Sequence, residues 1–149
     1  QSSLYEFAQG ALSDQQQPRP VQKQLLIRFK RFKGATEMDI VWEGLLLART
    51  IQRKAIPVIL ALDLEAVGLV CKPDIVTSRY HLDNATVKKL TAMQSLLQDL
   101  IKSGIQVVAS ERWAKHWSDN AKLMPGVKLL GDDELADTII EYAGSILDY

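Results

Sequence analysis

The sequence predicts a single α/β domain, with about five mostly parallel strands and helices on both faces of the sheet. Its 149 residues match the usual length of one domain. A hydrophobic fraction of 47% and a charged fraction of 24% are typical of a globular chain that builds its core without disulfides or metal. From Val21 onward, short apolar runs alternate with longer amphipathic segments, which is the pattern of strand–helix–strand units.

In the first half of the domain, two strands flank an amphipathic helix. The run KQLLIRF predicts a strand within residues 23–29, and the segment EMDIVWEGLLLARTIQRK predicts a helix over 37–54. Thr36 is the expected N-cap of this helix, with Asp39 three residues later as in a capping box. The run IPVILAL at 56–62 is almost entirely Leu and β-branched residues, which is typical of a strand covered on both faces.

The second half continues the alternation. Residues 63–70 fit one or two helical turns, whereas 72–83 read as polar and irregular. The remaining elements are expected as a helix at 85–104 capped by Asn84, a strand at 105–110, a short helix at 111–117, a strand at 126–130, a helix at 133–144 capped by Asp132, and a strand at 145–149.

Residues 1–20 differ in composition from the rest of the chain. They are rich in Gln and Ser and close with Pro18 and Pro20, which cannot continue a helix or a central strand. We expect a tail or docking arm here, outside a domain that spans 21–149. The start at Gln1 and this Ser/Gln-rich leader favour an exported, periplasmic chain over a cytoplasmic one.

Composition and motifs also limit the function. Lys plus Arg and Asp plus Glu both number 18, so the net charge is zero, which disfavours nucleic acid as a partner. No apolar run approaches the ~18 residues needed to span a bilayer. The single cysteine excludes CxxC zinc clusters, and neither histidine has a partner at metal-ligand spacing. The run KRFKGATEMD matches no phosphate-binding fingerprint, so we expect neither a metal nor a nucleotide cofactor.

Polar side chains follow the expected strands where each strand ends. Lys30 and Arg31 follow the first strand, and Ser110, Glu111 and Arg112 end or follow the third. Ligands of parallel sheets bind outside the carboxyl ends of the strands. These five residues are therefore candidates for ligand binding. A solvated strand end or a contact between subunits is the alternative interpretation of the basic residues.

Cys71 is the candidate catalytic residue. A cysteine reacts as a thiolate, which a positive neighbour stabilises, and Lys72, Arg79 and His81 lie in the following stretch. The alternative is a small buried apolar residue, because free cysteine is among the most buried residue types.

The segments LLLARTIQRKAIPVILALDLEAVGL, LLQDLIKSGIQVVAS and LMPGVKLLGDDELADTIIEYAGSILDY resemble the DsrE/DsrF-like family of sulfur-relay proteins. The resemblance covers residues 22–149. It implies a five-stranded, Rossmann-like domain that assembles into trimers or hexamers and carries a persulfide on a cysteine directly after the third core strand. Ser110 occupies that position here, and a hydroxyl cannot form a persulfide.

Three functions follow from these residues. The serine at position 110 favours a non-catalytic, homo-oligomeric binding or assembly domain in a sulfur-related context, so we expect binding rather than catalysis. A persulfide carrier that uses Cys71 and delivers sulfur to a partner protein is the alternative. The third is a small anionic ligand held at the carboxyl edge of the sheet by Lys30, Arg31, Ser110 and Arg112.

Overall fold

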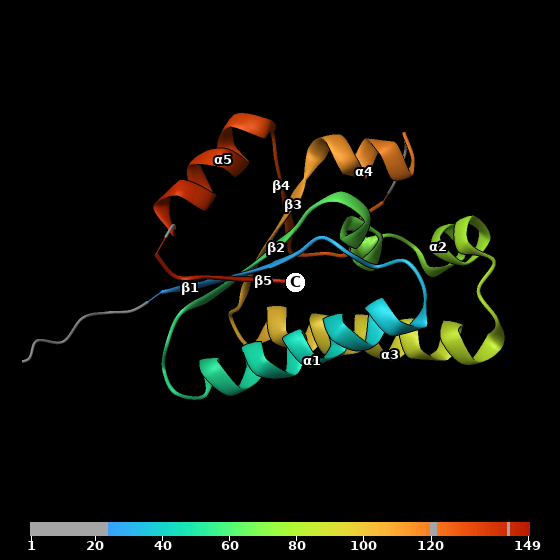
Figure 1. Cartoon of the computed structure of the whole chain (residues 1–149), viewed down its shortest axis with the longest axis horizontal. Helices are drawn as coiled ribbons and strands as arrows, with labels where there is room; N and C mark the ends of the chain where they lie inside the picture. The colour runs from blue at the N-terminus through green and yellow to red at the C-terminus, as the bar shows by residue number, and fades with distance from the viewer. Residues whose placement is uncertain (1–23, 120–121, 143) are drawn as a thin grey trace, which may run out of the picture.

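All strands in the described part of the chain run parallel in one sheet, in the order β4-β3-β2-β1-β5 (Figure 1). The computed structural model describes residues 24–119, 122–142 and 144–149, so the expected arm at 1–20 lies outside it. The elements are β1 (Leu25–Phe29), α1 (Ala35–Gln52), β2 (Val58–Leu62), the 3₁₀ helix η2 (Leu64–Val70), α2 (Pro73–Tyr80), α3 (Asn84–Lys102), β3 (Gln106–Ser110), α4 (Glu111–Trp117), β4 (Val127–Leu130), α5 (Asp132–Glu141) and β5 (Ile146–Asp148). This confirms the predicted α/β, Rossmann-like domain.

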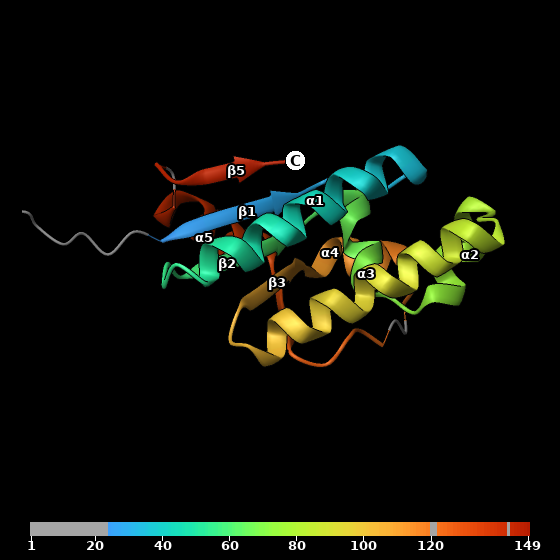
Figure 2. The same ribbon diagram turned by 90° about the horizontal axis from the view of Figure 1, so that it is seen from below.

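Helices cover both faces of the sheet. α1 and α3 lie side by side on one face and α5 lies on the other (Figures 1 and 2). Successive residues of a strand point to opposite faces. Ile27 and Leu60 accordingly join the core under α1 and α3, while Leu26 and Ile59 join a smaller cluster with Leu135 of α5. Every residue of β2 is buried, which confirms a strand covered on both faces.

The first helix begins two residues earlier than predicted. Gly34 is its N-cap with φ 89°, and Thr36 lies inside the helix rather than capping it. Glycine adopts positive φ without a steric penalty, so the chain turns into the helix at this residue. The Glu37 carboxylate accepts the Lys33 N–H at 2.8 Å, which replaces the predicted capping box.

The prediction of irregular structure at 72–83 is wrong, because most of this stretch forms α2. Pro73 stands at the first position of the helix, where its fixed φ favours helix and its missing N–H costs no hydrogen bond. His81 ends the helix in the left-handed conformation, with φ 53°. The polar composition therefore reflects an exposed helix rather than a loop.

Two further caps move by one residue. Asp83, not Asn84, caps α3, and its carboxylate accepts the Thr86 N–H at 2.8 Å. Gly131, not Asp132, is the N-cap of α5, and its N–H donates to the Glu134 carboxylate at 3.3 Å.

None of the described helices combines the length and the apolarity needed to cross a membrane.

Candidate functional site

The carboxyl edge of the sheet contains two neighbouring hollows. One has a volume of about 430 Å³ and is lined by Lys30, Arg31, Leu64, Glu65 and Trp113. The other, about 240 Å³, lies between α1 and β5 and includes Glu37, Ile40 and Tyr149 in its wall. Lys30 and Arg31 line both hollows, so the loop after β1 is common to the two.

The position of Lys30 is set by the last strand. Asp148 of β5 accepts hydrogen bonds from Arg28, with Nε at 3.2 Å and Nη2 at 2.9 Å, and from Lys30 Nζ at 3.1 Å. The hydrogen bonds to Arg28 lower the pKa of Asp148, and those to Asp148 raise the pKa of Arg28. This cluster fixes Lys30 at the edge but takes up part of its charge.

Arg31 differs from Lys30 because its charge has no ion-pair partner in the described part of the chain. It is exposed and forms no ion pair or hydrogen bond with any residue in 24–119, 122–142 or 144–149. A free guanidinium offers a planar fork of donors that fits carboxylate and phosphate groups. Arg31 is therefore the side chain at this edge best suited to bind an anion.

The three candidates after β3 serve other contacts. Ser110 is 1% exposed, and its hydroxyl accepts the Trp113 N–H at 3.3 Å as the N-cap of α4. Arg112 is exposed and pairs with Asp132 at 3.3 Å. Glu111 lines a separate hollow of about 120 Å³. The structure thus brings Lys30 and Arg31 together in the walls of both hollows. Ser110, Glu111 and Arg112 line neither of these two hollows.

Three residues of the larger hollow were not among the candidates. Trp113 lies in the first turn of α4 and is half-buried, and its ring centroid is 4.6 Å from that of His116. Its indole N–H is buried and has no hydrogen-bond partner in the described part of the chain. Leu64 and Glu65 enter from η2, where Leu64 has φ 51°. The closeness of Trp113 to a strand end was the available signal; nothing in the sequence indicated the left-handed Leu64.

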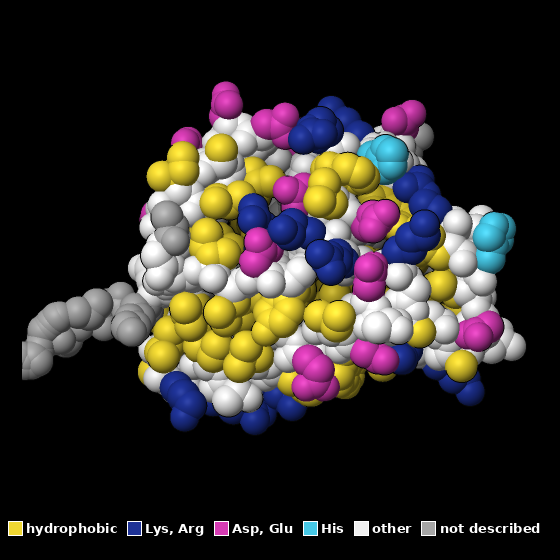
Figure 3. All heavy atoms as spheres, viewed as in Figure 1, with side chains coloured by type: hydrophobic (Ala, Val, Ile, Leu, Met, Phe, Trp, Pro, Cys, Tyr) yellow, Lys and Arg dark blue, Asp and Glu magenta, His cyan; other side chains and the backbone are white. Residues whose placement is uncertain are grey.

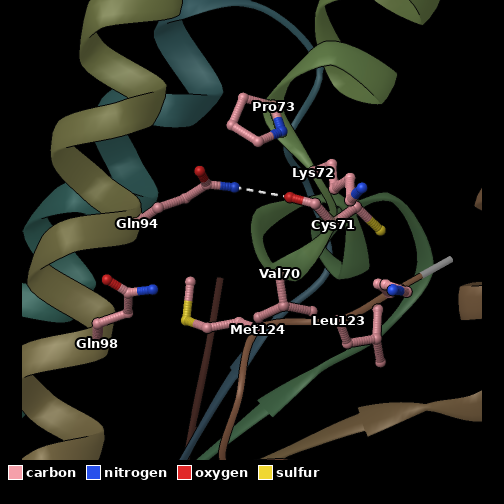
Figure 4. Close-up of a pocket in the computed structure, with 9 residues that line it drawn as sticks. Val70, Cys71, Lys72, Pro73, Gln94, Gln98, Leu123 and Met124 are labelled. Atoms are coloured by element: carbon pink, nitrogen blue, oxygen red, sulfur yellow. Dashed lines mark hydrogen bonds between the residues drawn. The ribbon is translucent and has the colours of Figure 1, made fainter.

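Cys71 lies by a different hollow, of about 220 Å³, between α3 and the segment around Met124 (Figure 4). It contributes its backbone carbonyl, which accepts Nε2 of Gln94 at 2.8 Å, while the sulfur points away from Gln94 and Gln98 (Figure 4). The side chain is 3% exposed, and Sγ donates to the Val67 carbonyl at 3.5 Å. Burial raises the pKa of the thiol to about 11, against a smaller opposing effect of Arg79.

Of the basic residues that follow Cys71 in the sequence, Arg79 lowers the pKa of the thiol, but by less than burial raises it. The Arg79 guanidinium lies 4.3 Å from the ring centroid of Trp117 and donates to the carbonyls of His116 and Trp117. Lys72 and His81 are exposed. In the described ranges, no group of three or more His, Cys, Asp or Glu side chains is placed to hold a metal ion.

No protein-family model matches the chain, and no curated protein does either. The class that the structure defines is an α/β, Rossmann-like domain in which Lys30 and Arg31 line two hollows at the carboxyl edge of the sheet.

Proposed function

We propose that this chain is a non-catalytic, homo-oligomeric binding domain of the DsrE-like type, which holds a small anionic ligand at the carboxyl edge of its sheet. The observation that carries the proposal is Arg31, which has no ion-pair partner among the described residues and lines two adjoining hollows together with Lys30. The larger hollow, at about 430 Å³, has the size of small-molecule sites.

Each wall of the larger hollow has a distinct role in this proposal. Arg31 binds the anionic group through two parallel N–H donors, and Lys30 adds a second positive charge. Trp113 and Leu64 provide an apolar wall for the body of the ligand. Glu65 opposes a large or highly charged anion by like-charge repulsion, so the site favours a small ligand of low charge.

The same geometry supports a binding function over a catalytic or sulfur-transfer function. The Ser110 hydroxyl is buried as a helix cap, where it is not presented as a nucleophile. The alternative, in which Cys71 carries a persulfide to a sulfur-transfer partner, requires an accessible thiolate. The burial of Cys71 and its raised pKa oppose that alternative.

Thermal unfolding with added anions tests the binding proposal. At constant ionic strength, we expect phosphate, thiosulfate or acetate to raise Tm relative to chloride, because a ligand that binds only the folded state stabilises it. Arg31→Gln should abolish this rise. Arg112→Gln is the matched control, since Arg112 is also exposed but lines neither hollow. No rise with any anion, or an equal rise in Arg31→Gln, would overturn the proposal.

Intact-mass spectrometry after incubation with a persulfide donor tests the alternative. We expect the wild type and Cys71→Ser to show the same mass gain, namely none, under conditions that load an accessible thiol. A gain of one sulfur atom that disappears in Cys71→Ser would establish Cys71 as the carrier and contradict a purely binding role.

A further inference from the structure

The larger hollow at the carboxyl edge contains an acidic side chain that anion binding does not use. Glu65 lines this hollow together with Arg31, and basic and acidic side chains lie intermixed on this face of the molecule (Figure 3). Glu65 is half-buried and forms no ion pair or hydrogen bond with any described residue, Arg31 and Lys30 included. The hollow therefore presents a guanidinium and a carboxylate that lie too far apart to pair with each other.

These two charges restrict the kind of ligand that the hollow can bind. A carboxylate that has lost part of its hydration is stabilised by a cation or by hydrogen-bond donors. The described part of the chain supplies neither to Glu65. A ligand with only a negative charge would be attracted by Arg31 and repelled by Glu65. A ligand that also carries a positive group avoids this repulsion and pairs with both side chains.

Two apolar residues complete the wall of the hollow. Leu64 is 38% exposed, and its φ of 51° lies in the left-handed region, which is uncommon for a large side chain. Trp113 is half-buried and lies in the first turn of α4. Such a wall binds a hydrocarbon side chain, and an aromatic ring also attracts a cation that lies over its face. The hollow thus combines a cationic group, an anionic group and an apolar wall.

We propose that the ligand of this hollow is a zwitterion, namely an amino acid with an apolar side chain. Its carboxylate pairs with Arg31, its ammonium pairs with Glu65, and its side chain lies against the apolar wall. The volume of about 430 Å³ suits a small ligand of this kind. The inference rests on the anion binding of the proposed function and names the class of ligand that the same site holds.

Isothermal titration calorimetry with three probes tests this inference. L-Leucine carries the carboxylate, the ammonium and the apolar side chain, whereas isocaproate lacks the ammonium and isoamylamine lacks the carboxylate. At neutral pH and constant ionic strength, we expect L-leucine to bind about tenfold tighter than either analogue, because each analogue loses one charged hydrogen-bonding group.

Glu65→Gln separates the two charged contacts. It should weaken the binding of L-leucine about tenfold, because the ammonium loses its carboxylate partner. It should strengthen the binding of isocaproate, because the repulsion by Glu65 disappears; this binding also shows that the variant folds. Glu111→Gln is the matched control, since Glu111 also lies in the first turn of a helix but lines neither hollow at this edge. Arg31→Gln should weaken the binding of both carboxylates.

The outcomes distinguish this inference from the proposed function. L-Leucine that binds no tighter than isocaproate would overturn the zwitterion, and isocaproate binding that Arg31→Gln abolishes would then leave the anion site intact. Equal losses of L-leucine and isocaproate binding in Glu65→Gln would also overturn it, because Glu65 would then support the wall rather than the ammonium. No binding of any probe would overturn the inference alone if anions still raise Tm, and both proposals if they do not.

Discussion

At the scale of single residues, the surroundings of Cys71 determine its chemistry. Its side chain is 3% exposed, and the loss of water around it destabilises the thiolate, so the pKa of the thiol rises from 9.0 to about 11. At pH 7 only about one molecule in ten thousand then carries a thiolate. A sulfur carrier needs that species. The positive charge of Arg79 does not offset the effect of burial on the thiol.

This raised pKa predicts a loss of stability at high pH. The unfolded thiol ionises near 9.0 and the folded one near 11, so the stabilisation is complete below pH 9 and is lost as the pH rises to 11. A two-unit shift corresponds to at most about 2–3 kcal/mol. Urea unfolding between pH 8 and 11 should show a smaller loss for Cys71→Ala than for the wild type. Parallel curves for the two proteins would contradict the shift.

The candidate site was predictable only in part, and the reason is local. Lys30 and Arg31 follow directly from the end of a strand, since the carboxyl ends of parallel strands share one edge. The same rule predicted Ser110 as a ligand-binding residue, but it could not show that the hydroxyl would accept the Trp113 N–H as the N-cap of α4. The sequence predicted helical turns at 63–70 but not the left-handed backbone of Leu64, so it did not show that Leu64 and Glu65 line the hollow.

At the scale of elements, α4 is held against η2 by a close contact between Gly68 and Trp117. A Cβ at Gly68 would lie 2.6 Å from Cζ2 of Trp117. The indole cannot easily move, because Arg79 stacks on it and Tyr80 packs against it edge-on, with the ring centroids 5.4 Å apart. Glycine is needed at this position for close packing.

Gly68→Ala should therefore lower the free energy of unfolding by about 1–3 kcal/mol, the usual cost of overpacking. Gly144→Ala is the matched control, since a Cβ at Gly144 meets nothing within 4 Å. Chemical denaturation measures both. Equal stabilities for the two variants would show that the indole yields to the added methyl group.

Ser110 is the N-cap of α4 and was also a predicted ligand-binding residue. Loss of its cap in Ser110→Ala should cost about 1 kcal/mol of stability. Ser95→Ala, an exposed substitution on α3, should cost little by comparison. Because the hydroxyl is occupied by the Trp113 N–H, the anion-dependent rise in Tm should stay as large as in the wild type. A weakened anion response in Ser110→Ala would show that Ser110 also contacts the ligand.

The sequence predicted the strands more accurately than the helix ends. Each observed strand falls within its predicted range, because buried parallel strands are runs of apolar residues bounded by polar ones. Helix starts shifted by one or two residues where glycine took the cap, as at Gly34 and Gly131. α2 was missed because its single buried residue, Val76, leaves no apolar periodicity to read.

At the scale of the whole molecule, the last strand returns to the first. β5 pairs with β1, so the sheet joins residues about as far apart in the sequence as this domain allows. Asp148 reaches Arg28 and Lys30 across 120 and 118 positions, and Tyr149 stacks on Phe29 with the ring centroids 5.6 Å apart. Pairing of the edge strand β5 with β1 therefore also sets the position of Lys30 beside the two hollows.

Asp148→Asn tests this link between the edge strand β5 and the position of Lys30. Loss of the charged partner should destabilise the fold by about 1 kcal/mol, since Arg28 keeps only a neutral acceptor. Asp132→Asn removes the exposed pair with Arg112 at 3.3 Å and should change little. The folded pKa of Asp148 lies below the unfolded value of 3.8, so its contribution is present above pH 3.8 and is lost as the pH falls through the folded pKa. The stability difference between wild type and Asp148→Asn should therefore shrink in acid.

Asp148→Asn should also strengthen anion binding, because Lys30 no longer shares its charge with a carboxylate. A larger anion-dependent rise in Tm than in the wild type, from a lower starting Tm, is the expected result. A smaller rise would mean that Asp148 helps the ligand by holding Lys30 in place. The sign of the change therefore distinguishes the loss of a carboxylate that competes for Lys30 from the loss of a contact that positions Lys30.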